Sequence, residues 1–288
     1  MANALAKTNQ QKTGITTYLN IDAVKQNIIS AVGKEKAPRF MSAVISAVQA
    51  NPDLGKCSNT SILSAALLGE SLNLTPSPQL GQYYLVPFDN TKKQTPEAQF
   101  QLGYKGYIQL AIRSGQYRKI IASEVKDGEI ASYNPVTEEF VLSPITDMGR
   151  REKTKTIGYY AMFELINGFR KEIYWSKEKM EEHAKRYSKG YASDLRKGNS
   201  WSFWSKDFDG MAKKTLLRQL ISKWGIMSID MEKAYSSDMA VLDDKGGVDY
   251  VDATDDVDMA KNEIAEAEAN SEELIIDMAP QQSEMNFA

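Results

Sequence analysis

The pair Asn167-Gly168 restricts the fold of this chain more than any other feature, because it joins two runs of alternating apolar and polar residues. The run before it is TIGYYAMFEL and the run after it is FRKEIYW, and both have the two-residue period of β-strands. Asn-Gly adopts the positive φ angles of a type I′ turn, whose twist matches that of the strands it connects. Residues 156–175 are therefore predicted to form an antiparallel β-hairpin.

The order of the other patterns along the chain indicates the fold class. Apolar residues at helical spacing come first, alternating runs with turn residues follow, and helical spacing returns after the hairpin. This order favours an α+β fold, in which a small antiparallel β-sheet with hairpins packs against helices, over alternating βαβ units. The predicted helices are 21–32, 38–50, 60–74, 107–115, 176–188 and 201–224, and the predicted strands are 82–88, 98–104, 118–142 with breaks at Asp127-Gly128 and Asn134-Pro135, 156–165 and 169–175.

Single residues mark several of the expected helix ends. Ser58 or Asn59 suits the N-cap of the third helix, and Ser176 suits the N-cap of the helix that follows the hairpin. Gly225 is predicted to end the last helix as a C′ residue, a position that favours the left-handed conformation. Residues 189–200 contain glycines and lysines, and we expect them to form a loop.

Charge is distributed very unevenly along the chain. Residues 229–288 hold 17 acidic residues and three lysines, a net charge of −14, which leaves residues 1–228 with a net charge of +11. A basic body of this kind is typical of polyanion-binding domains. The acidic segment is poor in aromatic residues, so we expect a largely disordered tail that solubilises the chain, binds a protein or competes for the basic surface. Residues 1–16 are expected to form a flexible arm, which leaves 17–228 as the folded domain.

Several kinds of chemistry have no signal in the sequence. One cysteine and one histidine exclude a disulfide framework and a Cys/His zinc site. Gly55-Lys56-Cys57 lacks the upstream glycine and the hydroxyl residue of a P-loop, so ATP-driven chemistry has no support. The carboxylates of residues 1–228 are scattered along the sequence. A two-metal nuclease site made from residues distant in sequence therefore remains an alternative. The polar N-terminus and the lack of a long apolar run favour a cytoplasmic protein without a membrane segment.

Basic residues at helical spacing supply the candidate binding residues. Lys105, Gln109 and Arg113 recur every four residues and are therefore expected on one helix face. Gly103 and Gly106 are expected to let backbone N–H groups approach a phosphate near the start of this helix. The complete candidate set for contact with a polyanion is Tyr104, Lys105, Tyr107, Gln109, Arg113, Arg118, Lys119, Arg150, Arg151, Lys206, Lys213, Lys214 and Arg218.

The last predicted helix combines basic and aromatic residues. Lys214 and Arg218 lie four residues apart, away from most of an apolar stripe that contains Trp204 and Phe208. Cations can neutralise phosphates while rings stack on bases, which fits a groove for a single strand with little sequence preference and strong salt dependence. Each basic face alone also fits an ordinary solvated surface. We expect Trp204, Phe208 and Trp224 to belong to the core, with stacking on bases as the alternative for these three rings.

Four long segments have a recognisable composition and order. They read LTPSPQLGQYYLVPF, QLGYKGYIQLAIRSGQ, YYAMFELINGFRKEIYWSKEKMEEHAKRYS and WSFWSKDFDGMAKKTLLRQLISKWGIMS. Within residues 30–228 the chain resembles the RecT family of phage and prophage single-strand annealing recombinases. The resemblance implies the annealase-type fold, a small antiparallel sheet packed with helices. The residues of these segments that the spacing also selects are Lys105, Gln109, Arg113, Lys213, Lys214 and Arg218.

The resemblance also implies a function. It implies that residues 17–228 bind single-stranded DNA, anneal complementary strands without ATP and assemble into an oligomeric ring or helical filament with a basic groove, in the cytoplasm of a bacterial host. The implied partners are single-stranded DNA, the annealed duplex, further copies of the chain, a phage exonuclease and the host single-strand-binding protein. No cofactor and no enzymatic activity are expected, with Mg²⁺ at most a counterion. The alternatives are a Mg²⁺-dependent nuclease subunit and a protective single-strand-binding protein.

Overall fold

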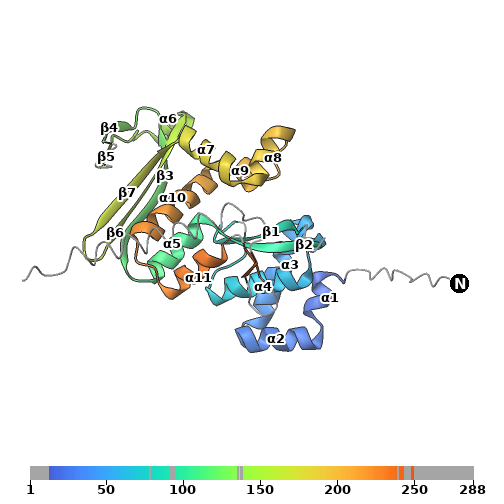
Figure 1. Cartoon of the computed structure of the whole chain (residues 1–288). Helices are drawn as coiled ribbons and strands as arrows, with labels where there is room; N and C mark the ends of the chain where they lie inside the picture. The colour runs from blue at the N-terminus through green and yellow to red at the C-terminus, as the bar shows by residue number, and fades with distance from the viewer. Residues whose placement is uncertain are drawn as a thin grey trace, which may run out of the picture. The chain divides into compact units, whose positions relative to one another are not determined.

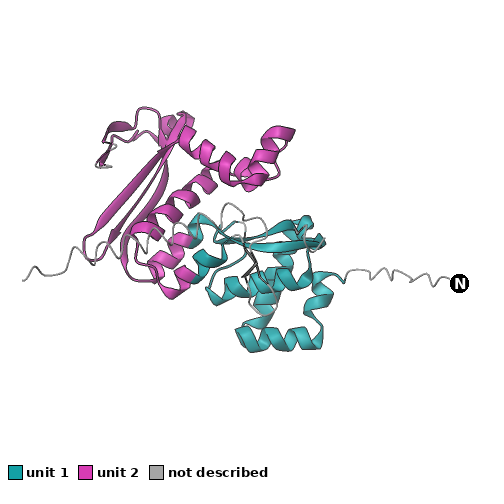
Figure 2. Ribbon diagram, viewed as in Figure 1, with its two compact units in different colours: residues 1–106, 233–251 teal, residues 107–232, 252–288 magenta. Residues whose placement is uncertain are grey.

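The computed structural model describes residues 13–77, 79–90, 95–134, 136, 139–238, 240–242 and 248–249. Within them the chain combines helices with antiparallel strands (Figure 1), which confirms the predicted α+β class. The described residues fall into two compact units, one made of residues from 13–106 and 233–249 and the other of residues from 107–232 (Figure 2), where we predicted one domain over 17–228. The unit boundaries fall inside α5 (Tyr104–Arg113) and α11 (Ile229–Ser237).

The first unit consists of helices packed against an antiparallel sheet. Ser58 caps α4, because its hydroxyl oxygen accepts a 3.2 Å hydrogen bond from the backbone N–H of Ser61. Tyr83 and Phe100 lie on adjacent strands, are buried and have ring centroids 5.0 Å apart, so the core lies between the sheet and α4. Besides the parts of α5 and α11, the elements are α1 (Ile15–Leu19), α2 (Asp22–Val32), α3 (Ala37–Ala50), the 3-10 helix η1 (Pro52–Lys56), α4 (Asn59–Ser71), β1 (Tyr83–Asn90), β2 (Thr95–Leu102), β8 (Ala240–Leu242) and β9 (Val248–Asp249), and the sheet order is β1-β2-β8-β9.

The acidic segment begins as folded chain. After α11, strand β8 pairs with β2, and the buried carboxylate of Asp238 accepts a 2.8 Å hydrogen bond from the backbone N–H of Leu102. The predicted start of a disordered tail at residue 229 is therefore wrong, because charge composition does not reveal strand pairing. The predicted arm over 1–16 also ends too late, because α1 begins at Ile15. Residues 1–12 and 250–288 lie outside the described residues.

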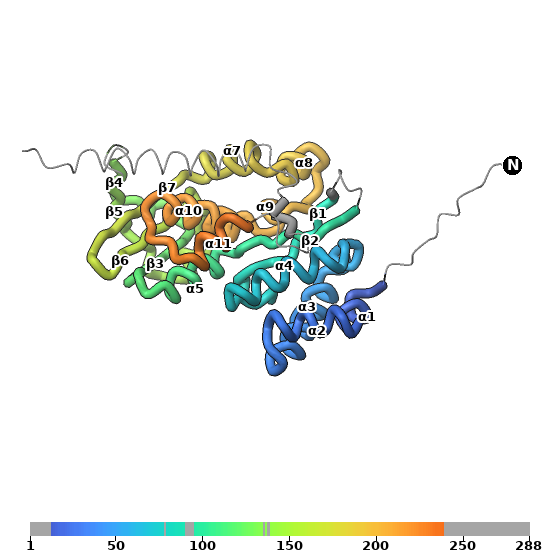
Figure 3. The backbone as a smooth tube through the Cα atoms, turned by 60° about the horizontal axis from the view of Figure 1, so that its bottom comes forward, coloured from blue at the N-terminus to red at the C-terminus, as the bar shows by residue number. Residues whose placement is uncertain are grey.

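The second unit is built around a three-stranded antiparallel sheet in the order β3-β6-β7. Asn167-Gly168 joins β6 to β7 as predicted, with Gly168 at φ +88°. Helix α10 packs along one face of this sheet (Figures 1 and 3), where the Tyr159 hydroxyl donates a 2.6 Å hydrogen bond to Asp209. The elements are β3 (Tyr117–Lys126), β4 (Ile130–Asn134), β5 (Glu139–Leu142), α6 (Met148–Lys153), β6 (Thr156–Leu165), β7 (Arg170–Ser176), α7 (Lys177–Tyr187), α8 (Lys189–Lys197), α9 (Phe203–Lys206) and α10 (Phe208–Trp224).

The β4–β5 hairpin covers part of the opposite face of the same sheet. Tyr160 follows Tyr159 in β6 and therefore points to the other side. Phe140 of β5 stacks on Tyr160 with ring centroids 5.5 Å apart and on Tyr174 of β7 at 4.8 Å. The second unit thus buries apolar side chains on both faces of its sheet, under α10 on one side and under this hairpin on the other.

Two predicted segments between the sheet and the end of α10 need correction. Residues 189–197 form helix α8 where we predicted a loop, and Ser188 caps it by accepting a hydrogen bond from the backbone N–H of Tyr191. The helix predicted over 201–224 is divided into α9 and α10 at Asp207, whose carboxylate accepts a 2.9 Å hydrogen bond from the backbone N–H of Gly210. Both helix starts use N-caps that the sequence contains but that periodicity alone does not identify.

Gly225 follows α10 for a different reason from the predicted one. Its φ angle is −87°, so it does not adopt the left-handed conformation. A Cβ atom at this position would lie 2.5 Å from the Tyr117 hydroxyl and 2.8 Å from the Ile221 carbonyl oxygen. The glycine is therefore required by the close approach of β3 to the end of α10.

Candidate nucleic-acid interface

Helix α5 presents the predicted row of polar side chains. Lys105 and Arg113 are exposed and Gln109 between them is half-buried, as expected for residues spaced by four on one helix face. The other side of the helix is buried through Leu110 and Ala111. The helix is therefore anchored by its apolar side, and its cations face solvent, where a phosphate backbone could reach them.

The two glycines at the start of α5 have a packing role. The N–H of Gly103 donates a 2.8 Å hydrogen bond to the carbonyl oxygen of Gln82, and the N–H of Gly106 donates to Gly103 at 2.9 Å. A Cβ atom at Gly103 or Gly106 would collide with the carbonyl oxygen of Gly81 or Gln82. The expectation that these N–H groups receive a phosphate is therefore wrong, because both already donate within the protein.

The two tyrosines of α5 differ in exposure. Tyr104 is half-buried, whereas Tyr107 is only 2% exposed. A ring this deeply buried belongs to the core and offers no face on which a base could stack. We therefore leave Tyr107 out of the interface proposed below.

The start of β3 adds two cations to the second unit. The Arg118 guanidinium forms a 2.9 Å ion pair with Glu164 and also donates to the carbonyl oxygen of Ile166 at 3.2 Å. Lys119 follows it and is exposed. Because an ion pair on a surface is readily exchanged for solvent or another anion, Arg118 stays compatible with phosphate contact.

Neighbouring arginines of α6 have opposite surroundings. Arg150 is exposed, whereas the Arg151 guanidinium donates hydrogen bonds of 2.6 and 3.1 Å to the buried carboxylate of Glu129. It also donates a 2.8 Å bond to the carbonyl oxygen of Glu124. Burial favours the neutral form of Glu129, but the hydrogen bonds from Arg151 and two backbone N–H groups outweigh this effect and hold the pKa of that carboxyl below its usual value. Arg151 thus stabilises the fold, and Arg150 is the arginine of this pair available to a ligand.

The three cations of helix α10 that we selected are all at least half-buried. The Lys213 ammonium forms a 2.7 Å ion pair with Glu124 of β3. Lys214 is only 5% exposed, and Arg218 is half-buried. The predicted basic face of this helix is therefore largely an internal face, which the spacing of four could not distinguish from a solvated one.

A basic surface on α7, α8 and α9 lay mostly outside the predicted set. Residues 177–206 contain eight basic and four acidic residues, and Lys206 was the one member selected from the sequence. Arg196, Lys197 and Lys206 are exposed. Trp201, in the loop between α8 and α9, is 68% exposed. The signal that we missed was the surplus of basic over acidic residues in this segment. We had interpreted the segment only as a helix followed by a loop.

The loop that carries Trp201 is held by one buried carboxylate. Asp194 of α8 accepts 2.7 Å hydrogen bonds from the backbone N–H of Ser202 and from the hydroxyl of Ser205, and its own carbonyl oxygen accepts from the N–H of Asn199. Burial alone would raise the pKa of Asp194, but the hydrogen bonds that Ser202, Ser205 and the Trp201 backbone donate to its carboxylate lower it to about 2. Trp201 is therefore an exposed ring on a fixed backbone.

Replacing Asp194 by alanine should lower the free energy of unfolding by about 2 kcal/mol at neutral pH, because several buried donors lose their acceptor. The folded-state pKa of about 2 is below the unfolded value of about 4, so the stabilisation is complete above about pH 5 and declines as the pH falls through 4 towards 2. Urea unfolding of the parent and the variant between pH 7 and pH 3 measures this difference. Glu182→Ala, at an exposed position of α7, is the control. A difference between parent and Asp194→Ala that stays constant over this range would contradict the assignment.

The described part of the chain lacks two features that would indicate another class of protein. No helix there is long and apolar enough to cross a membrane. Among the same residues, no three His, Cys, Asp or Glu side chains are grouped as metal ligands would be. His183 is half-buried in an aromatic cluster, with ring centroids 4.6 Å from Tyr187 and 5.3 Å from Trp175, so its ring has a packing role.

Comparison with known proteins identifies relatives over most of the chain. Residues 38–254 match the model of the RecT family. The chain is 36% identical over 264 residues to the "Uncharacterized protein YqaK" of Bacillus subtilis (strain 168), covering 92% of this chain and 83% of that protein. It is 27% identical over 232 residues to "Protein RecT" of Escherichia coli (strain K12), covering 79% of this chain and 81% of that protein.

Proposed function

Because the chain belongs to the RecT family, and so to the proteins of DNA recombination by single-strand annealing, we propose that it binds single-stranded DNA and anneals complementary strands without ATP. The match over residues 38–254 carries this proposal, and it agrees with the resemblance seen in the sequence. The net charge of +11 on residues 1–228 and the exposed cations of both units support contact with a phosphate backbone.

The proposed DNA contacts are the candidate residues that the structure leaves accessible, together with the surface on α8 and α9. Cations at these positions hold phosphates, and Trp201 and Tyr104 offer ring faces to bases. These contacts require no hydrogen bonds from the protein to base edges. The edges stay free, so Watson–Crick pairing alone decides whether a second strand is complementary. The proposed set is Tyr104, Lys105, Gln109, Arg113, Arg118, Lys119, Arg150, Arg196, Lys197, Trp201, Lys206 and the half-buried Lys213 and Arg218.

The remaining parts of the proposal concern assembly and partners. We propose that copies of the chain associate into a ring or filament, which multiplies weak contacts along one strand. A phage exonuclease and the host single-strand-binding protein are proposed partners in the cytoplasm of a bacterial host. The chain is proposed to act without a cofactor and without bond cleavage, with Mg²⁺ as a counterion.

Annealing of two complementary, fluorophore-labelled oligonucleotides without nucleotide tests the activity. We expect the protein to accelerate the appearance of energy transfer while both strands keep their length on a denaturing gel. Strands that shorten when Mg²⁺ is present would indicate a nuclease instead. Slower annealing with tight single-strand binding would indicate a protective binding protein. Either result would overturn the annealing proposal.

Replacing Lys105 and Arg113 together by alanine should weaken binding of single-stranded DNA and reduce the slope of log affinity against log salt by about 1 to 2. The reason is that each cation in contact with a phosphate releases about one counterion on binding. Fluorescence anisotropy titrations at salt concentrations from about 50 to 300 mM give both the affinity and its salt slope. Lys25→Ala with Lys34→Ala removes the same charge from exposed positions of α2 and the turn after it. Equal slopes for the two double variants would remove α5 from the interface.

A further inference from the structure

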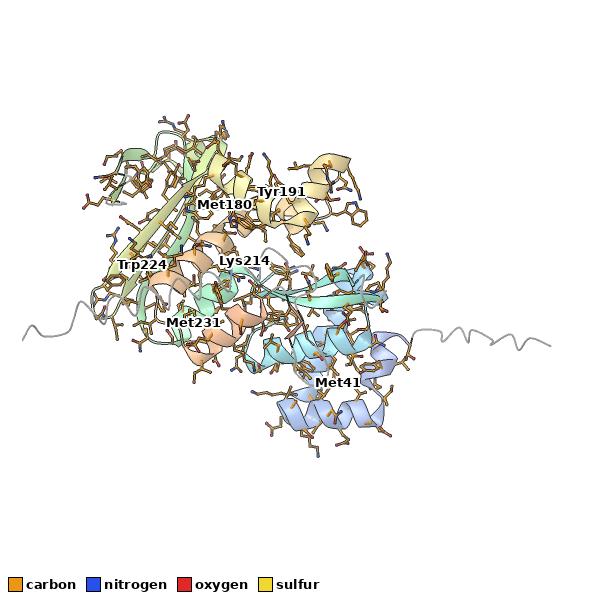
Figure 4. The ribbon with its side chains drawn as sticks, viewed as in Figure 1. Met41, Met180, Tyr191, Lys214, Trp224 and Met231 are labelled. Carbon is orange, nitrogen blue, oxygen red and sulfur yellow. The ribbon has the colours of Figure 1, made fainter. Side chains whose placement is uncertain are left out.

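An exposed apolar patch lies where the β6–β7 turn meets the end of α10. We call it the turn patch and define it as Ile166, Phe169, Trp224 and Ile226, all of which are exposed. Figure 4 shows Trp224 beside the β6–β7 hairpin. The expectation that this ring belongs to the core is wrong, because Trp224 is the last residue of α10 and is 50% exposed, with the Lys171 ammonium 4.6 Å from the ring centre. Large apolar groups gathered in this way mark an interaction surface.

Two hydrogen bonds fix the parts of the turn patch against one another. The backbone N–H of Ile166 donates a 3.0 Å bond to the carbonyl oxygen of Gln116, just before β3. The Tyr117 hydroxyl donates a 2.8 Å bond to the carbonyl oxygen of Ile226, after α10. The β6–β7 turn, the start of β3 and the residues after α10 are thus held together within the second unit, so the patch exists as one surface before anything binds to it.

Basic residues surround the turn patch. Five basic and two acidic residues occur in the three stretches that form this end of the unit, which are residues 116–119, 164–172 and 222–228. Both acids form ion pairs with arginines, Glu164 with Arg118 at 2.9 Å and Glu172 with Arg170 at 2.8 Å. The remaining basic residues are Lys119, Lys171 and Lys223. The patch therefore favours an occupant that is apolar at its centre and acidic at its edges.

The chain itself contains a segment of this character, outside the described residues. Leu274-Ile275-Ile276 is the only run of three large apolar residues after residue 249, and acidic residues stand on both sides of it. No lysine or arginine follows Lys261. The match to the family model ends at residue 254, before this run. We call residues 271–278, which read SEELIIDM, the acidic-apolar segment.

The length of the intervening chain allows the acidic-apolar segment to reach the second unit. Residues 250–273 connect it to Asp249, the last residue that the structure describes. A chain of this length spans up to about 80 Å when extended, compared with about 30 Å for a ten-residue strand. Such a tether also keeps the segment at an effective concentration on the order of 1 mM. A weak apolar contact is therefore enough for the docked form to predominate.

We propose that the acidic-apolar segment docks on the turn patch of its own chain. Its aliphatic side chains cover the exposed ring of Trp224 and its apolar neighbours, while the flanking carboxylates lie near Lys171 and Lys223. This segment is the occupant because it holds the longest apolar run of residues 250–288 and is opposite in charge to the surroundings of the patch. The inference goes beyond the proposed function and does not depend on DNA binding.

Contact quenching of a dye by tryptophan tests this docking in the full chain. The dye is attached to Ser271→Cys in a Cys57→Ser background, so that the buried native thiol cannot react. We expect the dye to be quenched in the parent, and Trp224→Phe to brighten it by about twofold or more, because the docked form predominates. Trp201→Phe is the matched control, since that ring is also exposed, and it should leave the quenching unchanged.

A second variant separates apolar docking from simple attraction of charge. Leu274→Ser with Ile275→Ser and Ile276→Ser keeps every charge of the chain, and it should brighten the dye as much as Trp224→Phe does. Circular dichroism and the melting temperature show that each variant is folded. Mixing labelled Trp224→Phe with an excess of unlabelled parent should not restore quenching, because each segment occupies the patch of its own chain.

Four results would overturn the proposal. A parent dye that is not quenched would mean that the segment does not reach the patch, which is then open to another partner. Equal brightening by Trp201→Phe and Trp224→Phe would indicate contact without a fixed position. Quenching that persists in the triple serine variant would show that charge alone attracts the segment. Quenching restored by unlabelled parent would place the segment on a different copy of the chain.

Discussion

Arg151→Ala should lower the free energy of unfolding by about 3 kcal/mol, the largest stability effect expected for a single substitution at any of the predicted binding residues. The guanidinium makes two hydrogen bonds to the buried carboxylate of Glu129 and one to the carbonyl oxygen of Glu124. Its removal leaves a buried carboxylate with only the backbone N–H groups of Lys126 and Ile145 as donors. The turn at Asp127-Gly128 and the start of α6 should loosen together, because Glu129 connects them.

Urea unfolding at pH 7 measures this effect, and Arg150→Ala provides the matched control. Arg150 is the adjacent residue and is exposed, so its removal takes away the same charge without breaking a buried ion pair. We expect Arg150→Ala to change the unfolding free energy by less than about 0.5 kcal/mol and to weaken DNA binding. The pKa of Glu129 is lowered in the folded parent, so the parent's advantage over Arg151→Ala is present near neutral pH and shrinks as the carboxyl becomes protonated in acid. Equal stability of the two variants would show that Arg151 is dispensable to the fold.

Trp201→Ala should weaken binding of single-stranded DNA by about tenfold, because stacking of a base on an aromatic ring contributes roughly 1 to 3 kcal/mol. The ring is 68% exposed, and the Asp194 carboxylate accepts hydrogen bonds from the backbones of Trp201 and Ser202, so little order has to be gained on binding. Arg196, Lys197 and Lys206 are exposed in the same segment and can hold the phosphates on either side of a stacked base. The fold should be unaffected, since the side chain contributes little to the core.

Anisotropy titrations at several salt concentrations separate this stacking contribution from the ionic one. Trp201→Ala should lower the affinity without changing the salt slope, whereas Arg196→Ala with Lys197→Ala should reduce the slope by about 1 to 2. Trp201→Phe should retain most of the affinity, because it keeps an aromatic face. If Trp201→Ala binds as tightly as the parent at every salt concentration, bases do not stack at this position and the surface on α8 and α9 acts through its charges alone.

Local signals in the sequence were sufficient for most of the strands and helices. Asn167-Gly168, the side chains of Ser58 and Ser176, and the break at Asp127-Gly128 each act through residues within a few positions, and the structure shows them where they were predicted. Short-range signals did not reveal the boundary between two helices that follow one another directly. The interruption at Asp207 between α9 and α10 depends on one capping carboxylate inside an otherwise continuous helical pattern.

The candidate site was predicted less completely than the fold. Spacing placed Lys105, Gln109 and Arg113 on one helix face, and the structure agrees. The same reasoning placed Lys213 and Lys214 on an open face, although one pairs with Glu124 and the other is buried. Periodicity describes which residues share a side of a helix, but it cannot say which side another element covers.

What the sequence determined by itself is therefore local and compositional: the turn residues, the caps, the α+β order of elements, the basic body and the RecT resemblance. These follow from backbone preferences within a few residues and from charge, which need no knowledge of the fold. Tertiary structure alone decided that Arg151 pairs with Glu129 while Arg150 stays exposed, that Gly225 is required by the Tyr117 hydroxyl, and that Trp201 is presented to solvent. Each of these depends on which residues distant in sequence come to lie against one another, because burial and partner choice are properties of contacts between elements.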